Sequence, residues 1–193
     1  MIFQRSIKNN VSAVGVGLHS GQKVRIVLKP AIENSGIVFK RTDIKVPVEI
    51  KVEPKAVKET QLSTTIGKGK FKISTVEHLM SALSASGVDN ILIEVDGSEI
   101  PIMDGSSISF IYLIKSAVVC EQLEFKRFAV IKEEIKVEDG EKFAKFEPYK
   151  GFLVDFTIDF PHPAFKKENS RVEIDFFKDS YVNHISRART FGF

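Results

Sequence analysis

Short stretches in the first half of the chain alternate apolar and polar residues, or gather β-branched and aromatic ones, as β-strands do. The stretches 23–30, 36–43 and 46–53 have this character, and prolines punctuate them. Residues 63–74 suit a hairpin with glycines at its turn, and residues 89–97 form another strand-like run. The first half is therefore predicted to be rich in strands.

Apolar residues change to helical spacing in two places. Segment 74–87 predicts a helix, because one apolar stripe recurs at i, i+3, i+4 and i+7 in Val76, Leu79, Met80 and Leu83. Ser74 and Glu77 have the spacing of a capping box, and Gly87 stands where a helix ends. Segment 106–119 predicts a second, more apolar helix. Together with the strands it completes an α+β unit of roughly 120 residues, an ordinary domain size.

Further along the chain the strand pattern resumes. Residues 129–148 predict a β-hairpin whose turn is Asp139–Gly140. Residues 151–160 and 170–176 alternate strictly, so each run is expected to bury one face and to expose the other. Residues 180–190 then begin a helix or a turn, and no strand pattern follows them.

The second half repeats the element order of the first in outline. We therefore expect an α+β protein with two related domains, 1–126 and 127–193, each a mainly antiparallel sheet layered on helices. The second domain is expected to be incomplete, because neither a helix stop nor a polar tail precedes Phe193. We expect the natural sequence to continue past this residue.

Composition narrows the class of protein. The chain has 193 residues, of which 43% are hydrophobic and 27% charged, an ordinary soluble composition. Its net charge of +3 comes from interspersed charges of both signs, which does not indicate a nucleic-acid surface. The single cysteine, Cys120, excludes an intrachain disulfide and fits a reducing compartment. Neither a secretory leader nor a run of about 18 apolar residues is present, so we expect a cytoplasmic protein without a membrane span.

One pair of residues stands out as candidate chemistry. Glu77 and His78 are adjacent in the first turn of the predicted helix. At about 100° per residue they lie roughly 110° and 150° from the centre of the apolar stripe, so the imidazole points away from the core. The face that His78 shares carries the small residues Ser81, Ala82 and Ala85. Such a face lets another backbone or a ligand approach closely.

Two interpretations of this pair remain open from the residues alone. In the first, Glu77 completes a capping box and His78 is a surface imidazole. In the second, the pair faces a cleft closed by another part of the protein. The positive end of the helix dipole would then favour neutral imidazole, the form that binds metals, and would stabilise the carboxylate beside it.

The other histidines carry weaker signals. His19 lies in the glycine-rich stretch 15–21, which is not a dinucleotide fingerprint and suits a β-turn. His162 stands between two prolines, and His184 suits a structural or exposed position. The sequence contains no HExxH motif, no paired CxxC motif and no phosphate-binding P-loop. Residue physics alone therefore indicates an α+β protein with one Glu–His pair of interest.

Five motifs, taken together, extend this interpretation. In chain order they are "GVGLHSG", "ISTVEHLMSAL", "EIPIMDGSS", "VDFTIDFPHP" and "ISRARTFGF". The set resembles the zinc-dependent UDP-3-O-acyl-N-acetylglucosamine deacetylases, which carry out the committed step of lipid A synthesis in Gram-negative bacteria. The likeness spans residues 1–193. It implies two domains of related fold with the active site between them, and a protein that is a monomer at full length.

The resemblance also implies roles for residues in catalysis. His78 corresponds to the first zinc ligand, Glu77 to the general base, and Thr190 to a threonine that stabilises the tetrahedral intermediate. The remaining ligands, a His and an Asp of an HKxxD stretch, and the histidine proposed as general acid come later in the family's sequence. An amide hydrolase suits these residue types, because zinc activates water and a neighbouring carboxylate takes its proton.

Substrate contacts follow from the same resemblance. Phe160, with Asp159 beside it, is expected near the uracil ring, Lys142 near the diphosphate, and His19 near the substrate's phosphates. Core packing is the other explanation for Phe160. A non-catalytic α+β module that binds a nucleotide or RNA is the alternative function for the whole chain. The Glu77–His78 pair discriminates between the two, because a binding module has no reason to hold a base beside a ligand.

Overall fold

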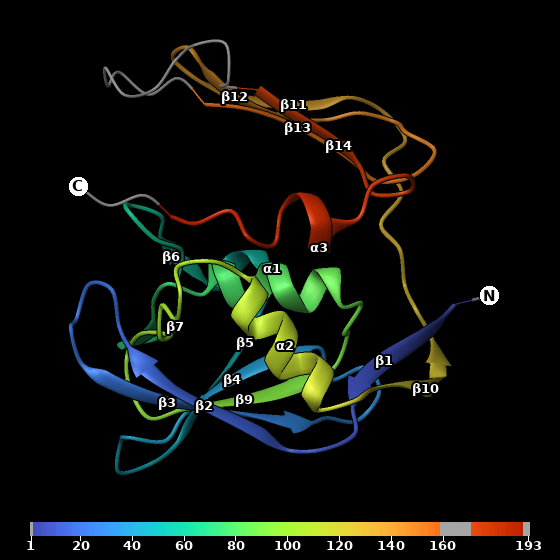
Figure 1. Cartoon of the computed structure of the whole chain (residues 1–193). Helices are drawn as coiled ribbons and strands as arrows, with labels where there is room; N and C mark the ends of the chain where they lie inside the picture. The colour runs from blue at the N-terminus through green and yellow to red at the C-terminus, as the bar shows by residue number, and fades with distance from the viewer. Residues whose placement is uncertain (1, 159–170, 191–193) are drawn as a thin grey trace. The chain divides into compact units, whose positions relative to one another are not determined.

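The computed structural model of the chain describes residues 2–158 and 171–190. The chain divides into two compact units. The first unit comprises Met1–Lys126 together with Ile185–Phe193, and the second comprises Arg127–His184. Figure 1 labels most of the elements of both units.

The first unit is built on a five-stranded sheet. Its strand order is β2-β3-β9-β4-β5, in which β4 and β9 are parallel and the other neighbours antiparallel. The strands are β2 (Val11–Val16), β3 (Lys23–Pro30), β4 (Ile37–Arg41), β5 (Val48–Lys51) and β9 (Ile91–Val95). On β3 the side chains of Val24, Ile26 and Leu28 are buried, while Lys23 before them and Arg25 among them are exposed. This alternation is the one the sequence predicts, and it turns one face of the sheet towards the core.

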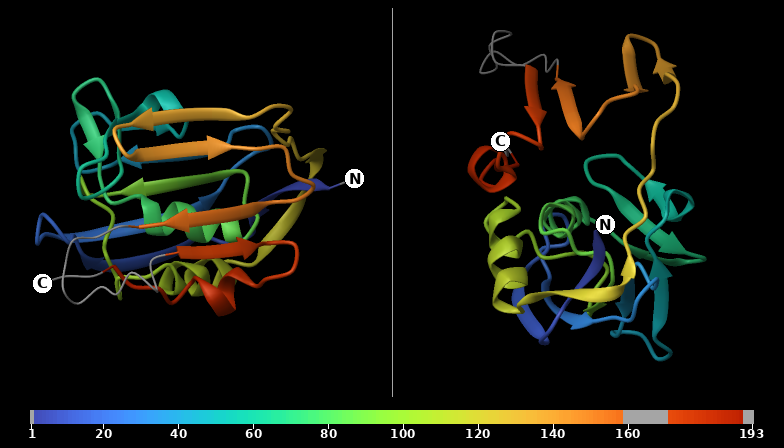
Figure 2. Two further views of the ribbon diagram at one scale, coloured as in Figure 1. Left: turned by 90° about the horizontal axis from the view of Figure 1, so that it is seen from above. Right: turned by 90° about the vertical axis from the view of Figure 1, so that its right-hand side faces the viewer.

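Two helices form the second layer. Helices α1 (Glu77–Ala85) and α2 (Ile108–Ser116) pack against each other and against the apolar face of the sheet (Figures 1 and 2). The predicted stripe on α1 is confirmed for Leu79 and Leu83, neither of which is exposed to solvent. Layered helices on a mostly antiparallel sheet confirm the α+β class.

The start of α1 differs from the prediction. Val76 occupies the cap position and makes no side-chain cap hydrogen bond, so the predicted capping box is wrong. The hydroxyl of Ser74 donates instead to the backbone oxygen of Ser98 at 3.3 Å, and the Glu77 carboxylate accepts the Thr64 N–H at 2.9 Å. The physical reason is that Ser74 pairs with Glu99 in an isolated parallel β-bridge. Its backbone is therefore extended and does not form the start of α1.

The small-residue face of α1 is buried only in part, with Ser81 half-buried and Ala85 exposed. Ala82 on this face is completely buried. Helix α2 lies beside α1 in the same unit, and small side chains permit such close helix packing. Ala85 and Ser84 at the far end of α1 are exposed.

Smaller sheets complete the first unit. Strand β1 (Phe3–Ile7) pairs with β10 (Val119–Phe125), and β6 (Val57–Glu59), β7 (Thr65–Lys68) and β8 (Phe71–Ile73) form a three-stranded sheet after the 3₁₀ turn Pro54–Ala56. The predicted hairpin at 63–74 is thus present. Strand β1 escaped prediction because Gln4 and Ser6 are polar. Both are nonetheless buried, with Asn90 donating to Gln4 at 2.7 Å and Ser6 donating to the Asn90 carbonyl at 2.7 Å.

In the described part of the second unit there are two strand pairs and one short helix. Strands β11 (Ile135–Asp139) and β12 (Lys142–Phe146) form a hairpin, β13 (Leu153–Thr157) pairs with β14 (Arg171–Asp175), and α3 spans Tyr181–His184. The predicted Asp139–Gly140 turn is confirmed, with Gly140 at φ 60°. The prediction that 151–160 and 170–176 each bury one face holds only at Ile174 among the described residues, which is 7% exposed, whereas Phe156 is 61% and Val172 49% exposed.

Among the helices of residues 2–158 and 171–190, none is both long and apolar enough to cross a membrane.

Candidate active site

The Glu77–His78 pair lies in the first turn of α1, as predicted. Both side chains are half-buried, while Leu79 after them is fully buried and anchors the helix to the core. The Thr64 N–H donates to Oε2 of Glu77 at 2.9 Å and so orients the carboxylate. A base and a potential metal ligand therefore stand side by side on a rigid element, where their relative geometry is well defined.

Thr190 belongs to the first unit. Its backbone N–H donates to the Gly105 carbonyl at 2.8 Å, and the Ser107 hydroxyl donates to the Ser186 carbonyl at 3.2 Å. The chain segment that ends at Thr190 thus packs on the loop before α2. Because α2 packs against α1, the structure gathers Thr190, Glu77 and His78 into one compact unit.

Asp104 in the same loop is a candidate that sequence reasoning did not single out. Its Oδ1 accepts the Ser109 hydroxyl at 2.8 Å and the Ser106 hydroxyl at 3.0 Å, and Arg189 lies 3.8 Å from its Oδ2. Burial raises the pKa of Asp104, but the bonds from Ser109 and Ser106 outweigh burial and hold it below its ordinary value. The carboxylate is therefore ionised at neutral pH. In the sequence, the motif "EIPIMDGSS", which contains Asp104, could have indicated this residue.

His19 lies on a loop whose backbone is held by Glu99. The His19 N–H donates to Oε1 of Glu99 at 3.0 Å and the Ser20 N–H to Oε2 at 2.8 Å. The Thr75 hydroxyl donates to the same Oε1 at 3.0 Å. Glu99 thus connects the His19 loop to the residues that lead into α1, a link that the sequence did not reveal.

The remaining predicted residues are less informative. Lys142 lies on β12 of the second unit with an exposed side chain, and His184 is exposed at the end of α3. Asp159, Phe160 and His162 lie outside the described residues.

His78 stands as a single candidate ligand. Within residues 2–158 and 171–190, no group of three or more His, Cys, Asp or Glu side chains is arranged to hold a metal ion. A half-buried imidazole suits zinc chemically, but a catalytic zinc takes three protein ligands and an open position. The described residues alone can therefore contribute to a zinc site without completing it.

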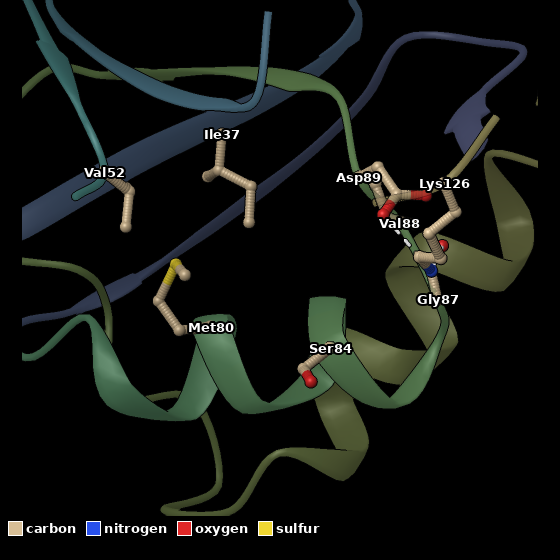
Figure 3. Close-up of a pocket in the computed structure, with 8 residues that line it drawn as sticks. All are labelled: Ile37, Val52, Met80, Ser84, Gly87, Val88, Asp89 and Lys126. Carbon is tan, nitrogen blue, oxygen red and sulfur yellow. Dashed lines mark hydrogen bonds and ion pairs between the residues drawn. The ribbon is translucent and has the colours of Figure 1, made fainter. Parts of the chain in front are cut away.

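A pocket of about 400 Å³ lies elsewhere on α1 (Figure 3). Met80 and Ser84 line it, and at about 100° per residue they stand roughly 200° and 240° around the helix from His78. The ion pair of Lys126 with Asp89, 3.2 Å long, closes one end. The other lining residues are Ile37, Val52, Gly87 and Val88. The pocket therefore lies away from His78, although Ser84, seven positions after Glu77, stands only about 20° from Glu77 around the helix.

Comparison with known proteins decides the family. The sequence profile of the UDP-3-O-acyl N-acetylglycosamine deacetylase family matches residues 4–193. The chain belongs to this family. Curated members named UDP-3-O-acyl-N-acetylglucosamine deacetylase are 53% identical in Methylococcus capsulatus and 50% identical in Thioalkalivibrio sulfidiphilus, each over 193 residues. A member from Haemophilus influenzae is 52% identical over 194 residues.

These matches cover the whole chain but 64% of each of the three relatives. The chain therefore spans less than two thirds of the length of the deacetylases that it matches. The resemblance in the five motifs is confirmed by this result, which weighs against the alternative of a nucleotide- or RNA-binding module.

Proposed function

We propose that the protein of full family length that contains this chain is a zinc-dependent deacetylase. It would remove the N-acetyl group of UDP-3-O-acyl-N-acetylglucosamine and release acetate, the committed step of lipid A biosynthesis. The observation that carries the proposal is the Glu77–His78 pair, fixed in the first turn of α1 in a member of this family. We further propose that the enzyme is cytoplasmic and monomeric.

The residues of this chain suit separate tasks in amide hydrolysis. His78 would provide one ligand, and when bound, zinc supplies the Lewis-acid chemistry that lowers the pKa of a water molecule to about 7. Glu77 would accept the proton of that water. The Thr64 N–H holds its Oε2, which leaves the carboxylate oriented for the transfer. Thr190, whose backbone N–H is bound by the Gly105 carbonyl, would donate a hydrogen bond from its hydroxyl to the developing oxyanion.

Lys142 and His19 would contribute to substrate binding. Lys142 is cationic and exposed, as a partner for the diphosphate must be. His19 would face the phosphates from a loop whose backbone Glu99 fixes. We also propose that Phe160 and Asp159 meet the uracil ring. The two-domain organisation, 1–126 and 127–193 with the second domain a partial repeat of the first, remains part of the proposal, as does the supply of the other zinc ligands from further along the chain.

Metal analysis of the full-length protein tests the proposal. We expect stoichiometric zinc and zinc-dependent release of acetate from the UDP-linked substrate. His78→Ala should lose both, whereas the matched control His184→Ala, at an exposed position on α3, should keep both. A folded full-length protein without zinc and without metal-dependent deacetylation would refute the enzyme assignment.

A further inference from the structure

Glu99 connects two segments that are far apart in the sequence. Its side chain is buried, with the residue only 2% exposed, between loop 17–22 and the segment before α1. From the loop it accepts the N–H groups of His19 and Ser20, and from the other side it accepts the Thr75 hydroxyl, at 2.8–3.0 Å. Each segment carries a candidate site residue at or next to the contact: His19 itself, and Glu77 two positions after Thr75.

The backbone on both sides of this carboxylate is unusual. Thr75 has φ 58°, a left-handed conformation that residues with a branched side chain rarely adopt and that persists only when the surroundings enforce it. On the loop side, a Cβ at Gly17 would collide with the Glu99 carboxylate and the Ser20 hydroxyl. The loop therefore closes directly over Glu99, and the bond to Thr75 helps to hold the strained entry into α1.

Burial of this carboxylate is balanced by hydrogen bonds. Burial raises the pKa of Glu99, but donors from His19, Ser20 and Thr75 outweigh burial and lower it. None of the ion pairs found among the described residues involves Glu99. A buried charge of this kind depends on every donor being in place, so it fixes the segments that supply the donors.

We propose that Glu99 is a positioning residue for the active site. It holds the His19 loop and the start of α1 in one arrangement, so that the loop and the Glu77–His78 pair address the same anionic substrate. This inference rests on the deacetylase function proposed above. Glu99 itself need not touch the substrate or the zinc.

Glu99→Gln tests the proposal with little change in size. The amide replaces one acceptor oxygen with an NH₂ donor, which then faces an N–H or O–H group. In the zinc-loaded full-length protein we expect kcat/KM to fall on the order of 10- to 100-fold, as for other groups that orient catalytic residues. The fall should include a raised KM, from the displaced loop, with zinc content unchanged. A merely structural role would lower the melting temperature and leave KM unchanged.

A readout independent of catalysis separates this inference from the proposed function. In residues 1–193, Glu99→Gln should speed amide hydrogen exchange at His19 and Ser20 while the amides of β3 and β9 stay protected. Glu94→Gln, which removes an ion pair with Lys29 on the sheet, is the matched control and should leave the loop unchanged. Faster exchange in this variant, together with a folded, zinc-supplied full-length parent that does not deacetylate the substrate, would support the structural coupling and reject the proposed function.

Thr75 provides a second pair of variants in case Glu99→Gln folds poorly. Thr75→Ala removes one of the bonds to Glu99, and Thr75→Ser retains the hydroxyl. We expect the alanine variant to show a smaller version of the Glu99→Gln effect and the serine variant to resemble the parent. Equal kcat/KM for Thr75→Ala and Thr75→Ser, or exchange that rises uniformly over all strands in the Glu99 and Thr75 variants, would overturn the positioning role.

Discussion

Strand β9 of the first unit and strand β13 of the second both place apolar residues at every second position, yet these residues are buried to different degrees. On β9, Ile91, Ile93 and Val95 are completely buried. On β13, Val154 is 38% and Phe156 61% exposed. Alternation therefore determines which side chains share a face of a strand, whereas burial requires a second layer to cover that face.

The covering layer is what distinguishes the two units. In the first, α1 and α2, of nine residues each, lie on the sheet, while the helix described in the second unit, α3, has four residues. The Glu77–His78 pair belongs to the well-packed first unit, because its helix, α1, is anchored by the buried side chains of Leu79 and Leu83. Groups that must keep a fixed geometry are best held by such well-packed elements.

The largest expected effect concerns residues 1–193 on their own. We predict that this chain neither binds zinc tightly nor deacetylates the substrate. The first unit supplies His78, and a catalytic zinc needs three protein ligands. Equilibrium dialysis against zinc, combined with an acetate-release assay, provides the measurement. Stoichiometric sub-micromolar binding that disappears in His78→Ala would mean that the ligand set has been assigned wrongly.

The next largest effect is expected on kcat when the carboxylate of Glu77 is replaced by an amide. In the full-length protein, Glu77→Gln should retain zinc and lose about 10²–10⁴-fold in kcat, because the amide cannot take a proton. It keeps the size of the side chain and can still accept the Thr64 N–H. Steady-state kinetics on protein with verified zinc content are the test. Near-normal kcat in the folded variant would leave Glu77 with a structural role only.

Much of the first unit can be predicted from sequence because its pattern and its contacts agree. Strand β3 has the predicted bounds, 23–30, since Val24, Ile26 and Leu28 both alternate and meet a covering layer. Strand β1 could not be predicted, because its buried residues Gln4 and Ser6 are polar. Their burial depends on hydrogen bonds to Asn90, which is distant in the sequence.

The candidate site divides in the same way. Glu77 and His78 could be placed on the first turn of a helix from local spacing and from the resemblance. The capping box failed because Ser74 is bound by Ser98, a partner 24 residues away. No role for Glu99 could be predicted from the sequence for a similar reason, because its side chain becomes buried only when the loop of His19 folds over it. Local pattern thus finds the element and misses the long-range contacts that orient it.

Two matched side-chain substitutions to alanine would test the difference in burial between β9 and β13. Ile93→Ala should lower the free energy of unfolding by about 2–5 kcal/mol, through lost burial and the cavity that remains. Phe156→Ala should change it by less than about 0.5 kcal/mol, because the ring is largely exposed. Urea unfolding of residues 1–193 followed by circular dichroism gives both values. Similar losses for the two variants would show that the β13 face is covered in solution.

The smallest expected difference lies in the ion pairs of the two sheets. Lys29 and Glu94 join β3 to β9 at 2.8 Å with their side chains 33% and 21% exposed, whereas Arg171 and Asp155 join β14 to β13 at 2.8 Å with side chains 61% and 42% exposed. Solvent and salt screen the second pair more strongly, although it has the better bidentate geometry.

Lys29→Met should therefore lower the free energy of unfolding by about 0.2–1 kcal/mol at low salt and by less at high salt. Asp155→Asn should produce no resolvable change at either salt concentration. Urea midpoints of the two variants at two salt concentrations test this. A larger loss for Asp155→Asn than for Lys29→Met would show that the second sheet is less solvated than its exposed side chains indicate.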